Sequence, residues 1–592
     1  MSRSLILASL LLVSLSLSAQ AQESDPVGFC YVRDGLLYTP DGNIMSLWGV
    51  NFQTPMPWEA KRLGKVGIGD DEESLNAVTD NNLDDVALLG ANLLRCPLSP
   101  AAFTDEKGNL LETSFLHALD HLVAQAEARG MYLTLTFITP MGGDCPGTAW
   151  VGTKYESKMT WIHDPEVVSC SKNYISQLVN RVNPCDGIAY KDNKSIAFWE
   201  IINEPEMFSY QDIEDSGYSQ AYHSWLSESG KEDCAENYAA YRTCLVRSYI
   251  DDMTDLLREN GDRHLVSWSL NWHRFRRDNK DIFDGVAASK ADIVSFCLYP
   301  GQDFVERDYT NFRHDFTDRS FADWLNKYLF MEDGYGWTKS DTFASKAKIA
   351  YEFETFFNQS GYLYPLLALY IKALGGQTAT MWTYTFEEIA PYFGGSHFLN
   401  LRCTPAKAAS FLVAKHIFDS LGPGLPLPSG VDDEMVCEEG DKLWAISKER
   451  DAAVYSDEDN YFTSGETASL WSGIKPSPRV KHVGGLGDSP LVSYSGTGVY
   501  LIDETPEGLT INLMPDVNIK GDQFFKGDYT NIVTELISDK ENSLSVKLER
   551  WSNTPGTLYS TGPNGERKAV SSHEGTLSLR LRPGNYIYIK KP

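Results

Sequence analysis

The sequence predicts an α/β protein in which a closed (β/α)8, or TIM, barrel precedes a C-terminal antiparallel β-sandwich. Between residues 44 and 382, short apolar runs alternate with segments whose apolar residues recur every three or four positions. Eight such runs, each followed by a helical pattern, favour a closed parallel barrel over an open sheet. Beyond residue 430 the apolar period becomes two, as in strands with one buried face.

Each predicted barrel strand is a short apolar run. The eight runs are Ile44–Asn51, Asn92–Pro97, Met131–Phe137, Ile196–Ile202, His264–Leu270, Ile293–Leu298, Lys348–Tyr351 and Thr378–Trp382. Among the intervening helices, apolar residues from Phe115 to Ala126 share one helical face, and Gly130 follows as a helix stop. The eighth helix is expected at Pro405–Leu421.

Three segments outside the strands complete the domain organisation. Tyr31–Tyr38 predicts a small hairpin that plugs the floor of the barrel. Gly422–Gly430 is rich in proline and glycine and predicts a linker. Between Leu544 and Leu548 apolar and polar residues alternate, which is typical of a β-sandwich. We expect a catalytic barrel over residues 22–421 and an accessory sandwich over 431–592.

The first residues predict export. Arg3 precedes an apolar run from Leu5 to Leu17, and small residues follow as far as Ala21. This order is typical of a secretory signal peptide over residues 1–21. The apolar run is short for a transmembrane helix. We therefore expect a secreted or periplasmic protein that is free of the membrane after cleavage.

Charge and cysteine content exclude several classes of ligand. The formal net charge is −29, with 81 Asp and Glu against 52 Lys and Arg. Nucleic acids and anionic membranes require clustered cations, so a neutral polysaccharide or oligosaccharide fits better. The ten cysteines show no CxxC-type spacing, so no structural zinc site is expected. No metal or organic cofactor is implied, and the disulfide pairing stays open.

The strongest candidate for chemistry lies at the end of the fourth strand. There an apolar run ends abruptly in Asn203-Glu204-Pro205. Proline interrupts a strand and favours an extended conformation for the residue before it, so Glu204 is expected to project from a fixed strand end. Asn203 can donate and accept hydrogen bonds with a sugar hydroxyl. A surface glutamate at a turn is the alternative reading.

A second acid follows the seventh strand. Glu352 comes directly after Lys348–Tyr351. Retaining glycoside cleavage requires two carboxylates across the scissile bond, one to protonate the leaving oxygen and one to attack. We interpret Glu204 as general acid/base and Glu352 as nucleophile. Glu354 shares the strand face of Glu352 by alternation and is the alternative nucleophile.

A series of short motifs follows the barrel spacing along residues 28–420. They are Leu89–Arg95, Tyr190–Asp192, Trp199-Glu200, Asn203–Pro205, Leu298–Pro300, Glu352-Phe353 and Trp382. Together they resemble glycoside hydrolase family five, in clan A of the retaining hydrolases, and the nearest likeness is to its endo-β-1,4-mannanases. The resemblance implies hydrolysis of a β-linked neutral glycan, most of all β-1,4-mannan, by double displacement.

The resemblance also implies substrate-binding residues, supported by the affinity of sugar faces for flat apolar rings. The expected set is Arg95, Asn203, Tyr299, Trp382, Trp150 and Trp272. Arg95 would lie near Glu352 and favour its ionised form. Tyr299 would donate a hydrogen bond to Glu352, and Trp382 would form an apolar floor for the sugar. For each residue, a purely structural role is the alternative.

One position departs from the family pattern, and other functions stay open. The family carries His-x-Tyr on the sixth strand, whereas this chain reads Cys297-Leu298-Tyr299. Cysteine lacks the charge and the two-sided hydrogen bonding of histidine. Three readings stay open: the change retunes the site, another side chain such as His273 fills the gap, or activity is weakened. An exo-β-mannosidase or a β-glucanase is the alternative within the enzymes. Long segments such as Ser209–Cys234 and Gln302–Tyr335 would favour exo action if they closed one end of the cleft. A catalytically silent glycan-binding protein is the alternative of another class.

Overall fold

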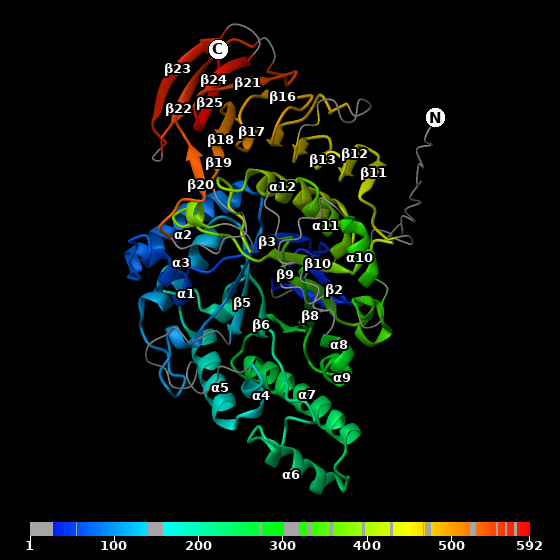
Figure 1. The fold of residues 1–592 in the computed structure, drawn as a ribbon. Coiled ribbons are helices and arrows are strands. Elements are labelled where there is room, and N and C mark those ends of the chain that lie inside the picture. The colour runs from blue at the N-terminus through cyan, green and yellow to red at the C-terminus, as the bar shows by residue number, and fades with distance from the viewer. Residues whose placement is uncertain are drawn as a thin grey trace, which may run out of the picture.

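The computed structural model describes most of the chain (Figure 1). The described residues are 28–591 except 55, 140–157, 272–274, 301–318, 330, 332–333, 356–358, 394–396, 427–429, 466, 468–474, 521–528, 552–553, 563–564 and 574–576. The predicted signal peptide, Trp150, Trp272 and His273 lie outside the described residues. They stay predictions.

Eight parallel strands close into a barrel in the order β10-β3-β4-β5-β6-β7-β8-β9. They are β3 Leu47–Asn51, β4 Leu93–Pro97, β5 Tyr132–Ile138, β6 Ile196–Ile202, β7 Leu265–Ser269, β8 Ile293–Leu298, β9 Ala347–Phe353 and β10 Gly376–Met381. The predicted barrel is confirmed, and each predicted run overlaps one strand. One boundary was wrong, because β9 continues to Phe353 and Glu352 lies inside the strand instead of after it.

Helices surround the barrel (Figure 1). The described helices are α1 Pro57–Gly64, α2 Glu72–Leu88, α3 Ser114–Ala128, α4 Thr160–His163, α5 Pro165–Asn180, α6 Ser219–Ser229, α7 Ala235–Glu259, α8 Phe275–Asp278, α9 Lys280–Ala287, α10 Phe321–Leu329, α11 Leu363–Ala373 and α12 Pro405–Ser420. Side chains of Asp71, Thr113 and Asp164 cap the N-termini of α2, α3 and α5 by accepting backbone N–H groups. Among the helices that the structure describes, none has the length and apolar character to cross a bilayer.

The predicted hairpin closes the N-terminal end of the barrel. Strands β1 (Tyr31–Arg33) and β2 (Leu36–Tyr38) pair antiparallel. Gln377 at the start of β10 holds the hairpin, because its side chain accepts from Leu37 N at 2.7 Å and donates to Leu37 O at 2.8 Å. Leu37 is buried in a cluster with Leu47 and Phe198. With this end filled, the carboxyl ends of the strands are left to form a site.

Residues after 433 form mostly antiparallel strands in two packed sheets. The larger sheet has the order β11-β12-β13-β14-β15-β17-β18-β25-β22-β23, the smaller β16-β21-β24, and β19 pairs with β20. Their bounds are β11 Glu434–Glu439, β12 Lys442–Ser447, β13 Ala452–Ser456, β14 Asn460–Thr463, β15 His482–Gly485, β16 Val492–Tyr494, β17 Tyr500–Glu504, β18 Leu509–Leu513, β19 Asp516–Ile519, β20 Thr534–Ile537, β21 Asn542–Val546, β22 Gly556–Thr561, β23 Arg567–His573, β24 Leu577–Leu581 and β25 Gly584–Lys590. Ile511 of β18 and Leu544 of β21 share the core between the two sheets. The expected antiparallel order fails at one pair, because β14 and β15 run parallel.

The other face of the larger sheet packs on the barrel. Helix α12 contacts β13, β14 and β15 (Figure 1). The ring of His416 on α12 stacks on Phe462 of β14 with centroids 4.0 Å apart. Trp444 and Ile446 of β12 belong to the same apolar cluster as the barrel helices. The sheet therefore forms a layer between α12 and the smaller sheet.

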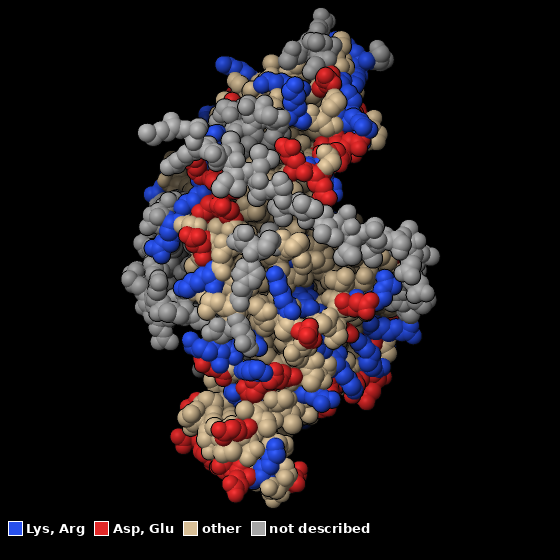
Figure 2. All heavy atoms as spheres, turned by 90° about the vertical axis from the view of Figure 1, so that its right-hand side faces the viewer, with Lys and Arg blue, Asp and Glu red and all other residues tan. Residues whose placement is uncertain are grey.

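Acidic and basic side chains are interspersed on one face of the molecule (Figure 2). Acidic residues prevail at the tip formed by α6 and its flanking turns. The acidic residues visible on this face are consequently not confined to one patch.

Candidate active site

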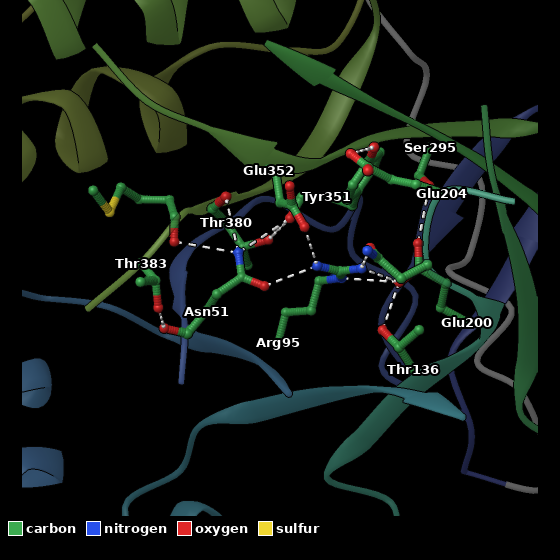
Figure 3. A network of polar contacts seen from close by, with 12 residues as sticks. Asn51, Arg95, Thr136, Glu200, Glu204, Ser295, Tyr351, Glu352, Thr380 and Thr383 are labelled. Atoms are coloured by element: carbon green, nitrogen blue, oxygen red, sulfur yellow. Dashed lines mark hydrogen bonds and ion pairs between the residues drawn. The ribbon is translucent and has the colours of Figure 1, made fainter. Parts of the chain in front are cut away.

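Strands β3, β4, β6, β8 and β9 bring a network of polar side chains together inside the barrel (Figure 3). Arg95 on β4 lies at its centre and is 1% exposed. Its guanidinium reaches Glu352 and Asn51 at one end and Glu200 at the other. Residues that were predicted from separate motifs are thus joined by one buried cation.

The Arg95 guanidinium uses all three nitrogens. Nη1 donates to Glu352 Oε1 and to Asn51 Oδ1, both at 2.9 Å. Nε and Nη2 donate to Glu200 Oε2 at 2.9 and 2.5 Å, and Nη2 also donates to Asn203 Oδ1 at 2.7 Å. Burial alone lowers the pKa of Arg95, but Glu200 and Glu352 outweigh it and raise the pKa above its ordinary value. Arg95 is therefore a permanent cation beneath the site.

Glu352 accepts a hydrogen bond on each carboxylate oxygen. Arg95 donates to Oε1, and the Tyr299 hydroxyl donates to Oε2 at 2.5 Å. Both contacts were expected. Burial raises the pKa of Glu352, Arg95 lowers it, Glu204 raises it, and the result is about 7. Arg95 does favour the ionised form of Glu352, but burial is the larger effect.

Glu204 follows β6 with a φ of 48°. The expectation of an extended residue before Pro205 was wrong. Asn203 N still donates to Ile138 O of β5, so the parallel ladder ends there and the chain turns away at Glu204. A positive φ is costly for a residue with a side chain and is found at sites where the surrounding structure imposes it.

Both oxygens of Glu204 also have partners. The Tyr351 hydroxyl donates to Oε1 at 2.9 Å, and Lys158 Nζ donates to Oε2 at 2.5 Å. The Glu204 side chain is 13% exposed. Glu204 and Glu352 therefore lie in one site, yet each is bound to its own cation.

Aromatic residues line the site beside Glu352. Tyr299, Tyr351 and Cys297 are buried together, and Trp382 packs against them while still partly exposed. The ring of Trp382 is 5.9 Å from that of Trp58. Trp382 therefore lies beside the two tyrosines that contact the carboxylates, and its role as a floor for the sugar stays a prediction.

The side chain of Asn203 has a partner at its oxygen. Arg95 occupies its Oδ1, which fixes the orientation of the amide. Among the described residues, the Nδ2 group of Asn203 has no hydrogen-bond partner. The amide of Asn203 is thus oriented by Arg95, and its role toward a sugar hydroxyl stays a prediction.

The alternative nucleophile is buried elsewhere. Glu354 forms an ion pair with Lys407 of α12 at 2.6 Å, and their side chains are 0% and 1% exposed. It also accepts from Tyr364 OH and from Phe398 N. Glu354 therefore ties β9 to α12, whereas Glu352 contacts Arg95 and Tyr299.

Sequence reasoning missed two residues that touch Glu204. Tyr351 immediately precedes Glu352, and strict alternation would turn the two side chains to opposite faces. The pairing of β8 with β9 shifts here, because Phe296 opposes Ala350 but Cys297 opposes Glu352. Tyr351 is the extra residue of this bulge, and bulges re-aim side chains beside sites. Lys158 lies in a segment without periodicity and carried no sequence signal.

The Cys297 thiol contacts the Tyr351 hydroxyl and does not replace an imidazole. Burial raises the pKa of this thiol well above its ordinary value, and the nearby Glu204 and Glu352 add to the rise. Cys297 is therefore a neutral group. Its neighbour Tyr351, and not Cys297, donates to Glu204.

Among the described residues, no group of three or more His, Cys, Asp or Glu side chains is arranged to hold a metal ion. The described residues of the site include carboxylates, a guanidinium, an ammonium and phenols. This set suits acid/base and nucleophilic chemistry on a neutral ligand.

Comparison with known proteins gives partial matches. No family model matches the chain. The chain is similar to mannan endo-1,4-β-mannosidases. It is 27% identical to mannan endo-1,4-β-mannosidase 5 of Arabidopsis thaliana over 215 residues, which are 34% of this chain and 42% of that protein. It is 32% identical to mannan endo-1,4-β-mannosidase 2 of the same plant over 123 residues, or 18% and 28% of the two chains. The chain thus spans less than half the length of these relatives.

Solved structures give more distant matches. The endo-1,4-β-mannanase from Rhizomucor miehei is 18% identical, with a TM-score of 0.40, over 60% of this chain and 90% of the other. The endo-β-1,4-mannanase from Thermotoga petrophila is 13% identical, with a TM-score of 0.42, over 92% and 98%.

Proposed function

We propose that this protein is a retaining glycoside hydrolase of the family-five type, with Glu352 as nucleophile and Glu204 as general acid/base. The observation that carries the proposal is the unlike surroundings of the two carboxylates. Glu352 is buried and held by Arg95 and Tyr299, whereas Glu204 is partly exposed and reached by Tyr351 and Lys158. Two carboxylates in such different surroundings are suited to different roles, one as nucleophile and one as general acid/base.

In the first displacement a Glu352 oxygen attacks the anomeric carbon and the glycosidic C–O bond breaks. Glu204 gives its proton to the leaving oxygen, and a glycosyl-Glu352 ester forms. Arg95 holds Oε1 and Tyr299 holds Oε2, so the attacking carboxylate cannot rotate away. Positioning of this kind lowers the barrier because the reacting groups are already oriented.

In the second displacement Glu204 acts as a base. It takes a proton from water, the water oxygen attacks the anomeric carbon, and the ester bond to Glu352 breaks. Two inversions give net retention. A retaining pair requires carboxylates about 5 Å apart, and we expect that separation for Glu204 and Glu352.

We propose β-1,4-mannan, or a mannose-containing oligosaccharide, as substrate. The similarity to mannan endo-1,4-β-mannosidases supports this choice, as does the acidic surface, which disfavours anionic glycans. Mannose and glucose differ in the orientation of one hydroxyl, so hydrogen bonds of about 1 kcal/mol each decide between them. The available Asn203 Nδ2 group is our candidate for this contact.

Endo action fits the position of the long segment Ser209–Cys234. Helix α6 packs against α7 in an aromatic cluster that includes Tyr222 and Tyr238, on the outside of the barrel (Figure 1). Tyr218 OH donates to Asp164 at the start of α5. The segment therefore packs against α5 and α7 on the outside of the barrel. Because it does not need to cover the cleft, this packing favours a cleft that is open at both ends.

The test is hydrolysis of a panel of soluble β-mannans and β-glucans, with product lengths and anomeric configuration recorded. We expect mannan to be cut fastest, a mixture of oligosaccharide lengths, and retention of the β-anomer. Release of single mannose units would contradict endo action and support exo action. A ratio of kcat/KM near one on matched manno- and gluco-oligosaccharides would contradict the proposed preference for mannan. Binding without hydrolysis would support the silent glycan-binding alternative.

Variants separate the two roles. Glu352→Ala should abolish turnover, because no glycosyl ester can form. Glu204→Ala should lose activity on natural glycans but keep much of it on aryl glycosides, whose leaving groups need little protonation. Glu228→Ala, at an exposed position of α6, is the matched control and should behave as wild type. Wild-type rates for Glu204→Ala on a natural glycan would contradict the assignment.

A further inference from the structure

One pair of strands connects the C-terminal strands to the top of the barrel. We call strands β11 to β25 the C-terminal module. Within it, β19 and β20 form a two-stranded sheet of their own, separate from the two packed sheets. We call β19, β20 and residues 529–533 the arm. In Figure 1 the arm extends from the two packed sheets towards the barrel.

The arm is bound to the segment that joins β10 to α12. Val533 N donates to Pro391 O at 2.8 Å, in the 3₁₀ turn η7 (Ala390–Tyr392). Leu536 of β20 packs against a buried cluster of that segment, which we call the loop cluster. Its members are Ala390, Phe393, Phe398 and Cys403. The C-terminal module therefore adds one side chain to an apolar cluster that otherwise belongs to the barrel domain.

The loop cluster lies one residue away from a contact with the active site. Phe398 belongs to the cluster, and its backbone N–H donates to Glu354 Oε2 at 3.1 Å. The ring of its neighbour His397 lies 5.4 Å from the ring of Tyr299, at an angle of 85°. Aromatic rings attract each other in this edge-to-face arrangement. Because Tyr299 donates to Glu352, His397 is one contact away from the proposed nucleophile.

The backbone of His397 is held in place by its surroundings. Its φ is 62°, in the left-handed region that residues with side chains seldom adopt. Such a conformation persists where neighbouring structure imposes it. Leu399 N donates to Thr383 O at 3.3 Å, and Phe398 is fixed by Glu354 and by the loop cluster. The position of His397 therefore depends on how the loop cluster is packed.

We propose that the arm makes the C-terminal module a working part of the active site. By packing Leu536 on the loop cluster it keeps His397 against Tyr299, and Tyr299 in turn keeps the Glu352 carboxylate oriented for attack. This inference rests on the proposed function and leaves its chemistry unchanged. Leu536 and His397 are positioning residues, because both act through Tyr299. A carboxylate that is already oriented attacks faster than one that rotates freely.

Loss of this positioning should affect all substrates alike. Attack by Glu352 is required for every leaving group, whereas protonation by Glu204 is required mainly for poor ones. A defect that acts through Tyr299 therefore lowers kcat/KM by the same factor for a natural glycan and for an aryl glycoside. A defect that acted through Glu204 would spare the aryl glycoside.

The test measures kcat/KM for wild type, His397→Asn, Leu536→Ala and the double variant, on a manno-oligosaccharide and on an aryl mannoside. Asparagine tolerates a positive φ as histidine does, but it carries no aromatic ring. We expect His397→Asn to lose roughly 2- to 10-fold on both substrates, the factor that one aromatic pair contributes. Leu536→Ala should lose a similar or smaller factor on both.

The double variant should lose no more than His397→Asn alone, because the two side chains act through one contact. The matched control is Ile532→Ala. Ile532 lies on the arm beside Val533, but its side chain is 48% exposed, so this variant should behave as wild type.

Thermal unfolding separates positioning from a general loss of stability. Leu577 is buried in the core between the two packed sheets, on β24. Leu577→Ala should lower the unfolding temperature, yet well below that temperature its kcat/KM should equal that of wild type. Leu536→Ala should lower kcat/KM under the same conditions, although Leu536 is partly exposed and its loss costs less stability.

Wild-type kcat/KM for His397→Asn or for Leu536→Ala would overturn the inference. So would aryl mannosides that are spared, or a double variant whose two losses multiply. In each of these cases an enzyme that still depends on Glu204 and Glu352 would leave the proposed function standing. Absence of hydrolysis by wild type on every glycan tested would instead overturn the proposed function.

Discussion

The hydroxyl of Tyr351 donates to Oε1 of Glu204 across 2.9 Å, joining residues 147 positions apart in the chain. Tyr351 is the extra residue in the pairing of β8 with β9. Because of the bulge, Tyr351 and Glu352, which are neighbours in sequence, both point into one site, where Tyr351 contacts Glu204 and Glu352 contacts Arg95. One irregular residue in β9 thus couples the proposed acid/base to the strand that carries the proposed nucleophile.

Tyr351→Phe removes this hydrogen bond and keeps the ring. We expect kcat/KM on a natural glycan to fall roughly 10- to 100-fold, because a hydrogen bond to a charged group contributes about 1.5 to 3 kcal/mol. Aryl glycosides with good leaving groups should lose less, since they need little help from Glu204. Equal losses on both substrate classes would contradict a role through Glu204.

Glu352→Gln should stabilise the fold, and more so at higher pH. The pKa of Glu352 is raised from 4.5 to about 7, so between these values the folded protein binds more protons than the unfolded chain. Wild-type stability then falls as pH rises through this window, by up to about 1.4 kcal/mol per pH unit, and levels off above it. Glutamine has no charge to bury.

Thermal or urea unfolding between pH 4 and 8 measures this difference. The gap between Glu352→Gln and wild type should open across the window named above. A gap that is constant with pH would show that Glu352 is not the titrating group.

Lys407→Met should destabilise the protein without acting on the chemistry. It leaves Glu354 buried and without its cation, which costs roughly 3 to 5 kcal/mol. Glu354→Gln combined with Lys407→Met should recover much of this loss, because no charge is then stranded. Urea unfolding of the single and double variants measures the coupling.

Activity provides the control for that pair. Well below the unfolding midpoint, Glu354→Gln/Lys407→Met should hydrolyse mannan at near the wild-type rate. A loss of activity as large as that expected for Glu352→Ala would make Glu354 a candidate nucleophile again.

Cys297 should resist alkylation in the native protein. Its side chain is buried and its thiol pKa lies well above the ordinary value, so little thiolate forms and no reagent reaches it. Cys244 is exposed and serves as the internal control. Mass spectrometry after iodoacetamide treatment at pH 8 should show Cys244 modified, Cys297 intact and activity retained. Modification of Cys297 with loss of activity would contradict its burial.

The barrel was predictable because its strands are buried on both faces. Such strands read as continuous apolar runs, as in Ile196–Ile202, which the structure reproduces residue for residue. The helix that starts at Pro405 was also found, because proline suits the first helical position. The parallel pairing of β14 and β15 was not, since alternation is the same in parallel and antiparallel strands.

The sequence predicted the positions of those site residues that lie at or near the carboxyl ends of the barrel strands. Arg95, Asn203, Tyr299 and Glu352 meet as expected, because parallel strands deliver their carboxyl ends to one place. The positive φ of Glu204 opposed a local preference, and tertiary contacts prevailed. The position of Lys158 depends on how a non-periodic segment lies over the strands, which no local pattern encodes.

The stacking of His416 on Phe462 has a consequence for biosynthesis. A chain leaves the ribosome from its N-terminus, so all eight strands and α12 emerge before the sheet that covers α12. At 5 to 20 residues per second, the outer face of this helix waits several seconds for β13 to β15. During that interval the nascent chain presents an uncovered apolar helix to chaperones. The barrel, although made first, is therefore completed only after the first strands of the C-terminal sheet have been made.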